Sequence, residues 1–234
     1  INKRYIITFT IGLIKDCKMI SDKIEILKTN IPKNITLVAV SKTKPVEMIE
    51  EACSKGHLDF GENKVQELVH KYESLPKNIR WHMIGHLQRN KVKYIAPFVH
   101  LIHGADSLKL LKEINKQGIK NNRKINCLLQ IHIAKEENKF GFSLVEIREL
   151  LKSNEHHLWN NINIVGLMGM ATFTENKNLV KQEFDYLKNI FDEVKDHFNE
   201  NFHIISMGMS GDYKEAIEAG SNMIRIGSNI FGRR

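Results

Sequence analysis

The chain has 234 residues, of which 42% are hydrophobic and 26% charged, a composition typical of a globular protein. This length suits one large α/β barrel or two small domains. The formal net charge of +8 would suit a nucleic-acid partner. However, the excess of positive charge comes from lysines, and the sequence has no arginine-rich cluster and no alternation of aromatic and basic residues. We therefore expect no nucleic-acid binding. Three widely spaced cysteines argue against a disulfide framework and a zinc knuckle, and they suit a reducing, cytoplasmic setting.

The amino end does not fit the rest of the chain. Residues 1–18 precede the first methionine, Met19, and carry the apolar run YIITFTIGLI. That run is about half the ~20 residues that a membrane span needs, and no signal-cleavage pattern follows it. We therefore expect a non-native or disordered leader at residues 1–18, no membrane association, and one domain at residues 19–234.

From Met19 onward, strand and helix patterns alternate. A helix is predicted from Ser21, a favourable N-cap, to a stop before Pro32. A strand follows at residues 35–41, and Pro45 then starts a helix that Gly56 ends. Further strands are predicted at residues 58–61, 81–84, 99–103, 125–133, 162–168, 204–207 and 223–226. The helices between them are predicted at residues 64–75, 107–117, 144–152, 179–198 and 213–219.

Eight short apolar strands alternating with helices predict a single (β/α)₈ TIM barrel. An open, doubly wound parallel sheet is the alternative, but no pattern marks a second domain. In a TIM barrel, functional side chains gather at the carboxyl ends of the strands, and phosphate often binds at the loops after strands seven and eight.

The loops after the last two predicted strands carry small and hydroxyl residues. Gly227 and Ser228 follow strand eight directly, and Ser210 and Gly211 follow strand seven. Backbone N–H groups and hydroxyls in such loops can bind a phosphate. Taken separately, Ser210 could instead cap a helix and Gly227 could make a turn. No P-loop or dinucleotide fingerprint is present.

The first predicted strand ends in LVAVSKTKP, with two lysines. Alternation places Val38, Val40 and Lys42 on one face of the strand. At a barrel mouth, a desolvated lysine near other cations can attack an aldehyde and form a Schiff base. Lys44 has the same parity but lies in the turn before Pro45, so Lys42 is the preferred candidate. The alternative is that Lys42 is a solvated strand-end charge.

The histidines of the middle of the chain suggest a metal site less strongly. They are His82, His86, His100 and His103. No H-E-x-x-H or comparable carboxylate pairing accompanies them, so we interpret them as structural and expect no metal.

Five ordered stretches carry a resemblance to a known family. They are LVAVSKTKP, FGENKVQE, WHMIGHLQRNK, GLMGMATF and SMGMSGDYKEAIEAGSNMIRIGSNIFG, and they span residues 35–232. The sequence resembles the pyridoxal phosphate homeostasis proteins, whose barrel is similar to the amino-terminal domain of alanine racemase. WHMIGHLQRNK is interpreted as architecture near the cofactor mouth, with a helix opening at residues 88–91.

The resemblance implies pyridoxal 5′-phosphate as cofactor and a set of binding residues. Lys42 would hold it as a Schiff base, and Ser210, Gly227 and Ser228 would bind its phosphate. The resemblance also implies that Arg225 faces the pyridine nitrogen and that Asn63 lies near the cofactor. An arginine there leaves the nitrogen unprotonated and the ring a weak electron sink, which disfavours transamination. Alternatively, Arg225 pairs with a carboxylate at the barrel rim.

Three functions follow from these observations. We favour a pyridoxal phosphate carrier without its own turnover, which binds, buffers and delivers the cofactor, with apoenzymes that require it as possible recipients. The second is an amino-acid racemase or lyase using Lys42 as sole base. It is disfavoured because the chain ends at Arg234, soon after strand eight, whereas racemases take a second base from a further domain. The third is a phosphate-binding module without a covalent cofactor. We expect a monomer, with a dimer as the alternative.

Overall fold

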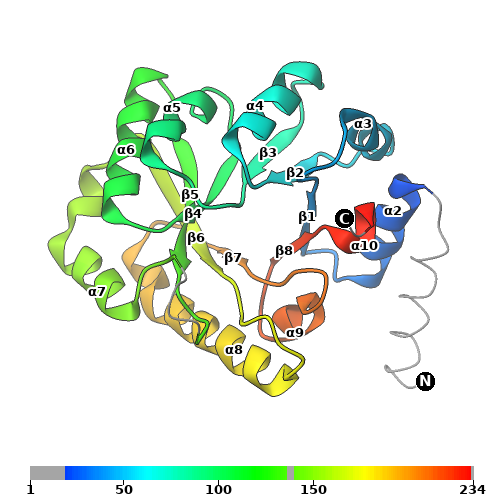
Figure 1. Ribbon diagram of the computed structural model, residues 1–234. Coiled ribbons are helices and arrows are strands. Elements are labelled where there is room, and N and C mark those ends of the chain that lie inside the picture. Colours follow the sequence, from blue (N-terminus) through cyan, green and yellow to red (C-terminus); the bar gives the residue numbers. More distant parts are fainter. Residues whose placement is uncertain (1–18, 136–139, 233–234) are drawn as a thin grey trace.

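The computed structural model describes residues 19–135 and 140–232, so the predicted leader at residues 1–18 lies outside the described part of the chain. Eight parallel strands form a closed barrel in sequence order (Figure 1). The strands are β1 (Thr36–Val40), β2 (Asp59–Glu62), β3 (Arg80–Met83), β4 (Leu101–Ala105), β5 (Ile125–Ile131), β6 (Ile162–Gly169), β7 (Ile204–Ser206) and β8 (Met223–Ile226). The predicted (β/α)₈ barrel is confirmed.

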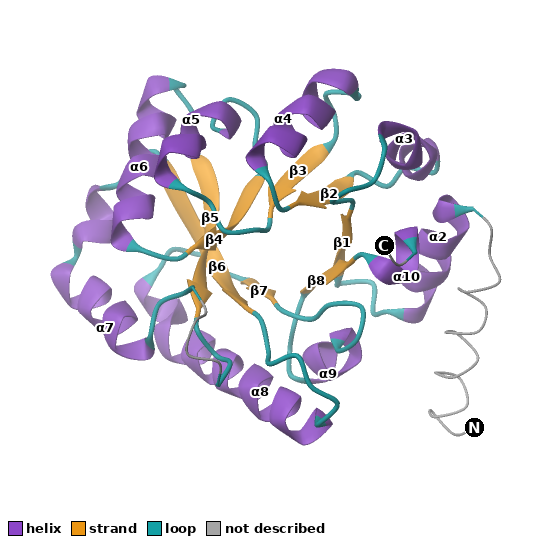
Figure 2. Ribbon diagram, in the orientation of Figure 1, coloured by secondary structure: helices purple, strands orange, loops and turns teal. Residues whose placement is uncertain are grey.

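Helices surround the barrel on its outside (Figure 2). The described α-helices are α2 (Ile20–Asn30), α3 (Val46–Ser54), α4 (Val65–Ser74), α5 (Val92–Ile95), α6 (Leu108–Lys120), α7 (Leu144–Ser153), α8 (Lys177–Val194), α9 (Tyr213–Glu218) and α10 (Ser228–Phe231). Short 3₁₀ turns lie at Arg89–Lys91, Glu155–Leu158 and Lys195–His197. Within the described ranges, no helix is long and apolar enough to span a bilayer.

Alternation along each strand produces two apolar layers. The larger layer lies between strands and helices and includes Leu37, Ala39, Phe60 and Trp81. The smaller one fills the barrel, with Val38, Leu101, Leu128, Val165, Met168 and Met223. Because neighbouring residues of a strand point to opposite faces, Val38 faces inward while Leu37 and Ala39 face the helices. The same rule orients the polar residues of the strands.

Several boundaries differ from the prediction for local reasons. Ser21 does not cap α2, because the helix begins one residue earlier and Glu51 of α3 accepts the N–H of Ile20 at 2.6 Å. β4 begins at Leu101 rather than at Val99, whose N–H donates to the carbonyl of Ile95 at 2.8 Å. The sequence patterns also did not indicate the short helix α10. At α2 the contact that sets the boundary comes from another helix, whereas at Val99 it comes from the preceding turn.

Candidate functional site

Lys42 lies two residues beyond β1, at the carboxyl end of the barrel. The N–H of Ser41 still donates to the carbonyl of Gly61 at 3.1 Å, so the chain follows β2 past the end of the strand. Val38 and Val40 are buried on the inner face, and Lys42 continues that alternation. The Lys42 side chain is half-buried, as expected for an amine at the rim of the barrel interior.

Lys44, the alternative lysine, is used differently. Its Nζ donates to the carbonyl oxygens of Phe231 at 3.0 Å and Gly232 at 3.4 Å. These carbonyls lie at the carboxyl end of α10, where a cation is favourable. Lys44 therefore ties the β1 loop to the end of the chain, and its amine is engaged away from the barrel interior.

A group of charges behind β1 holds the Lys42 turn. Thr43 has φ = 64°, a left-handed conformation that is uncommon outside glycine. Its N–H donates to Glu67 Oε1 at 2.5 Å. Lys71 of α4 donates to the same carboxylate at 2.7 Å and to the carbonyl of Ser41 at 2.8 Å. The residues on both sides of Lys42 are thus fixed by α4.

The same group contains a buried ion pair. Lys71 Nζ lies 2.8 Å from Glu62 Oε1, and the two side chains are 3% and 0% exposed. Ser41 Oγ donates to that oxygen at 2.6 Å. Burial raises the pKa of Glu62, although Lys71 and Ser41 oppose the rise. Glu62 Oε2 has no hydrogen-bond partner among the described residues. Sequence reasoning missed this group; its only signal was the i, i+4 spacing of Glu67 and Lys71.

The loops after β7 and β8 are joined by hydrogen bonds. The N–H of Gly227 donates to Ser210 Oγ at 3.2 Å, and Asn229 Nδ2 donates to the carbonyl of Ser210 at 3.3 Å. α9 begins at Tyr213, so Ser210 does not cap it and that alternative is wrong. Ser228 is exposed and opens α10. Ser210, Gly227 and Ser228 therefore lie on two loops in contact.

Gly208 makes the turn that brings Ser210 over β8. Its φ of 96° favours glycine, and a Cβ there would lie 2.6 Å from the Cβ of Ala216. Its carbonyl accepts the N–H of Arg225 at 3.0 Å. The loop after β7 is thus tied both to α9 and to β8.

Arg225 lies on the inner face of β8, opposite Val38 of β1 in the barrel register. It is 4% exposed. Its Nη1 donates to the carbonyl and the hydroxyl of Ser206 at 2.7 and 2.6 Å, and Nη2 donates to the carbonyl of Gly169 at 3.0 Å. These acceptors are neutral, so the alternative of a carboxylate partner at the rim is wrong. Burial lowers the pKa of Arg225 to about 10, and the guanidinium is still charged at neutral pH.

Asn63 follows β2 directly and is half-buried. Val40 pairs with Gly61 in the register, so two further residues on each chain bring Lys42 and Asn63 to the same level. Gly85, in the next loop, passes so close that a Cβ would lie 2.5 Å from the carbonyl oxygen of Asn63. Glycine is therefore required where the β3 loop crosses the β2 loop.

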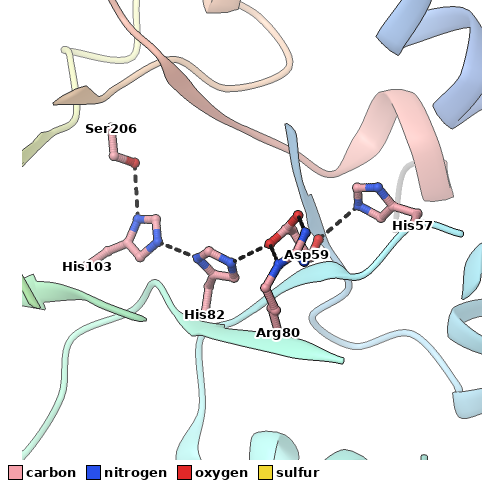
Figure 3. Close-up of polar contacts among 6 residues, drawn as sticks. All are labelled: His57, Asp59, Arg80, His82, His103 and Ser206. Atoms are coloured by element: carbon pink, nitrogen blue, oxygen red, sulfur yellow. Dashed lines mark hydrogen bonds and ion pairs between the residues drawn. The ribbon is translucent and has the colours of Figure 1, made fainter. Parts of the chain in front are cut away.

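The histidines do not form a metal site. No group of three or more His, Cys, Asp or Glu side chains in the described ranges could hold a metal ion. His86 Nδ1 donates to Asp106 Oδ2 at 2.8 Å, and the ring stacks on Phe140. His82 and His103 instead belong to a polar line through the barrel interior (Figure 3). At the end of the stretch WHMIGHLQRNK, residues 89–91 form a 3₁₀ turn. An open cleft of about 550 Å³ lies beside this turn.

The six predicted site residues come from four neighbouring strands. The barrel order places β7, β8, β1 and β2 side by side. Lys42 follows β1, Asn63 follows β2, and the others belong to β8 and the loops after β7 and β8. They therefore share one sector of the carboxyl-terminal face of the barrel. What this sector offers is an amine, a buried guanidinium, and loop N–H and hydroxyl groups.

Comparison with known proteins identifies the family of this chain. Residues 16–234 match the family model described as alanine racemase, N-terminal domain. The pyridoxal phosphate homeostasis protein of Aquifex aeolicus is 39% identical over 199 residues, which cover 85% of this chain and 86% of that protein. The homologous protein of Synechocystis is 37% identical over 212 residues, covering 90% and 96%.

Solved structures show the same fold. PipY of Synechococcus elongatus with pyridoxal phosphate bound has a TM-score of 0.83 and 28% identity, covering 92% of this chain and 100% of that one. Alanine racemase of Enterococcus faecalis has a TM-score of 0.71 at 15% identity, covering 92% of this chain and 58% of the racemase; this likeness concerns the fold alone. The chain belongs to the pyridoxal phosphate homeostasis protein family, which is built on the barrel of the alanine racemase N-terminal domain.

Proposed function

We propose that this protein binds pyridoxal 5′-phosphate covalently through Lys42, and that it buffers and delivers the cofactor without turning over a substrate of its own. The cofactor's aldehyde condenses with a lysine amine and releases one water. The observation that carries the proposal is the position of the Lys42 turn, held at the barrel mouth beside β8 by α4. PipY, which spans the same barrel, was solved with pyridoxal phosphate bound.

The residues of this sector fit the cofactor chemically. Arg225 uses three of the five N–H groups of a guanidinium on Ser206 and Gly169, which leaves Nε and one hydrogen of Nη2 for the pyridine nitrogen. The loops bearing Ser210 and Ser228 offer hydroxyls for the phosphate. Asn63 would contact the cofactor from the β2 side. A cationic partner that gives up its proton reluctantly keeps the ring nitrogen unprotonated, and this suits storage better than electron withdrawal.

Two alternatives are tested together with the proposal. An amino-acid racemase or lyase would use Lys42 as its base, and a phosphate-binding module would bind the phosphate without a covalent bond. The names of the curated relatives favour homeostasis over turnover. We also propose, in line with the expectations from the sequence, that the protein acts in the cytoplasm, chiefly as a monomer, and passes the cofactor to apoenzymes that require it.

The decisive experiment is chemical trapping. Purified protein is incubated with pyridoxal phosphate, reduced with borohydride and digested, and the modified peptide is located by mass spectrometry. The proposal expects one phosphopyridoxyl group on Lys42. Modification of Lys44 would move the site by two residues, and no modification alongside tight phosphate binding would favour the non-covalent module. Turnover of amino acids by the loaded protein would establish the enzyme.

A further inference from the structure

A line of polar side chains crosses the barrel interior, which is usually packed with branched apolar residues. Alternation places these side chains on the inner faces of β2, β3, β4 and β7, since their strand neighbours pack against the helices. The side chains of Asp59, His82, His103 and Ser206 are buried. Figure 3 shows them in contact one after another. Buried polar groups of this kind need a reason, because each must be hydrogen-bonded to be tolerated.

The line is continuous from Arg225 to the amino ends of β2 and β3. Ser206 Oγ accepts from Arg225 at 2.6 Å and lies 3.1 Å from His103 Nδ1. His103 Nε2 lies 2.9 Å from His82 Nδ1, and His82 Nε2 lies 3.2 Å from Asp59 Oδ1. Arg80, at the amino end of β3, donates to both oxygens of Asp59 at 2.7 and 2.5 Å. One arginine therefore stands at each end.

The end groups set the direction of the hydrogen bonds. Burial alone would raise the pKa of Asp59, but bonds from Arg80 and His82 outweigh it and hold the pKa below its usual range. The ionised Asp59 can only accept, so His82 carries its hydrogen on Nε2. An imidazole whose one hydrogen is on Nε2 offers Nδ1 as an acceptor, here to His103 Nε2–H at 2.9 Å. Burial lowers the pKa of His103 well below the ordinary value, so its Nδ1 in turn accepts the hydroxyl hydrogen of Ser206.

The result is a single direction of donation along the line. Arg225 donates to Ser206, Ser206 to His103, His103 to His82, and His82 to Asp59. Because the one hydrogen of Ser206 is committed to His103, its lone pairs face Arg225. One of the three hydrogen bonds that hold the guanidinium therefore depends on groups that extend to the amino ends of β2 and β3.

We infer that Ser206, His103, His82 and Asp59 form a relay of hydrogen bonds that positions Arg225, with its remaining N–H groups directed toward the ring of the bound cofactor. The relay rests on the proposed function for its role toward pyridoxal phosphate. These four residues are positioning residues, since they act through Arg225. Apolar side chains on the same strands would fill the space but would remove the bond to the Ser206 hydroxyl, so that only the carbonyls of Ser206 and Gly169 would hold the guanidinium.

The first test needs no cofactor and no variant. Two-dimensional ¹⁵N NMR of the histidine rings in the cofactor-free protein should show His82 and His103 as neutral rings with the hydrogen on Nε2. A hydrogen on Nδ1 of His103 would mean that Ser206 receives a bond from His103 rather than giving one. That result would overturn the relay as stated.

The second test compares two substitutions at one position. His103→Leu keeps the approximate volume but removes both nitrogens, whereas His103→Asn leaves a smaller side chain with an amide oxygen near the place of Nδ1. We expect His103→Leu to speed hydrogen exchange at Arg225 Nε in the cofactor-free protein. It should also weaken pyridoxal phosphate binding by about two- to tenfold, as loss of one hydrogen bond implies, and shift the visible band. His103→Asn should restore most of the affinity and the band.

Which of the two variants binds pyridoxal phosphate more tightly shows whether His103 positions Arg225 or only fills space. If His103 served packing alone, Asn would be worse than Leu because it leaves the larger cavity. A folded His103→Leu protein with wild-type exchange at Arg225, affinity and band would also refute the relay. If the wild-type protein binds no pyridoxal phosphate, the proposed function fails. The ring tautomers and the exchange at Arg225 would still decide whether the relay exists. Should His103→Leu not fold, the wild-type tautomers and His103→Asn decide it.

Discussion

A buried cation lies on each side of the β1 loop, Lys71 on one side and Arg225 on the other. The two differ in how many of their N–H groups donate to other parts of the protein. Behind β1, Lys71 gives its three hydrogen bonds to Glu62, Glu67 and the carbonyl of Ser41. In front, Arg225 donates three bonds to Ser206 and Gly169 out of five N–H groups. A saturated cation stabilises a local conformation. A cation with donors to spare, at the mouth of a barrel, can bind a ligand.

We expect the largest effect from substitution of Lys42, which lies between Lys71 on one side and Arg225 on the other. Lys42→Ala should remove the visible absorbance of the cofactor-loaded protein completely, because the proposed covalent bond needs the Lys42 amine. Circular dichroism and melting should remain close to wild type, since the half-buried side chain contributes little packing. Lys44→Ala is the matched control and should keep the absorbance. Colour that survives in Lys42→Ala and disappears in Lys44→Ala would reverse the assignment.

Removing the Lys71 cation should lower the free energy of unfolding. Lys71→Met leaves Glu62 buried without its cation, and removal of one partner of a buried pair costs about 3–5 kcal/mol. Urea unfolding measures the loss. Lys112→Met, which breaks the exposed pair with Glu155, should cost no more than about 1 kcal/mol. Because the Ser41 and Thr43 anchors loosen with Lys71, cofactor binding should weaken as well. Unchanged stability in Lys71→Met would show that the pair does not hold the turn.

The loops after β7 and β8 allow a test of the proposed phosphate site. If Ser210 and Ser228 bind the phosphate as proposed, replacing both by alanine removes two charge-assisted hydrogen bonds of about 1.5–3 kcal/mol each. Affinity for pyridoxal phosphate should fall at least about tenfold, while high concentrations still give the visible band. Pyridoxal without phosphate should bind both proteins equally in the same titration. Wild-type affinity of the double variant for the phosphorylated cofactor would place the phosphate elsewhere.

The smallest expected effect concerns pH and lies away from the mouth. Burial lowers the pKa of His57 to about 4, below its ordinary value of 6.5. The unfolded chain therefore takes up a proton before the folded one, so stability is full above pH 6.5 and declines as pH falls toward 4. Between pH 7.5 and 5 this loss amounts to about 2 kcal/mol. In His57→Gln the midpoint of urea unfolding should depend less on pH than in the wild-type protein. The control is His203→Gln, which replaces an exposed histidine and should leave this dependence as it is.

Sequence patterns predicted the barrel because every strand carries its own signal. In β1 and β8 the alternation of inner and outer residues is local, and a turn or cap follows each. The placement of Lys42 on the inward-facing register follows from the same alternation. The start of α2 was not predictable, because a distant residue sets it. Glu51 of α3 caps α2, and no property of residues 19–22 indicates it.

Within the candidate site, only the residues that are proposed to face the ligand were predictable from the sequence. Short motifs mark Lys42, Ser210 and Gly227, and the family resemblance adds roles. The charges behind β1 carry no comparable mark, since Lys71 is an ordinary helix lysine until α4 packs against β1. Likewise His82 and His103 are 21 residues apart in the chain, and only adjacent strands bring their rings together. Burial then turns common residues into a defined network.

By itself the sequence determined the periodic features of this protein: eight strands, their inward faces and the lysine that continues one of them. These depend on neighbours a few residues away, which any stretch of chain carries with it. Only the tertiary structure decided which cations are saturated, which way the buried histidines donate, and that Ser210 contacts Gly227 rather than capping a helix. Those outcomes depend on burial and on closure of the barrel between β8 and β1, and both exist only when the whole chain has folded.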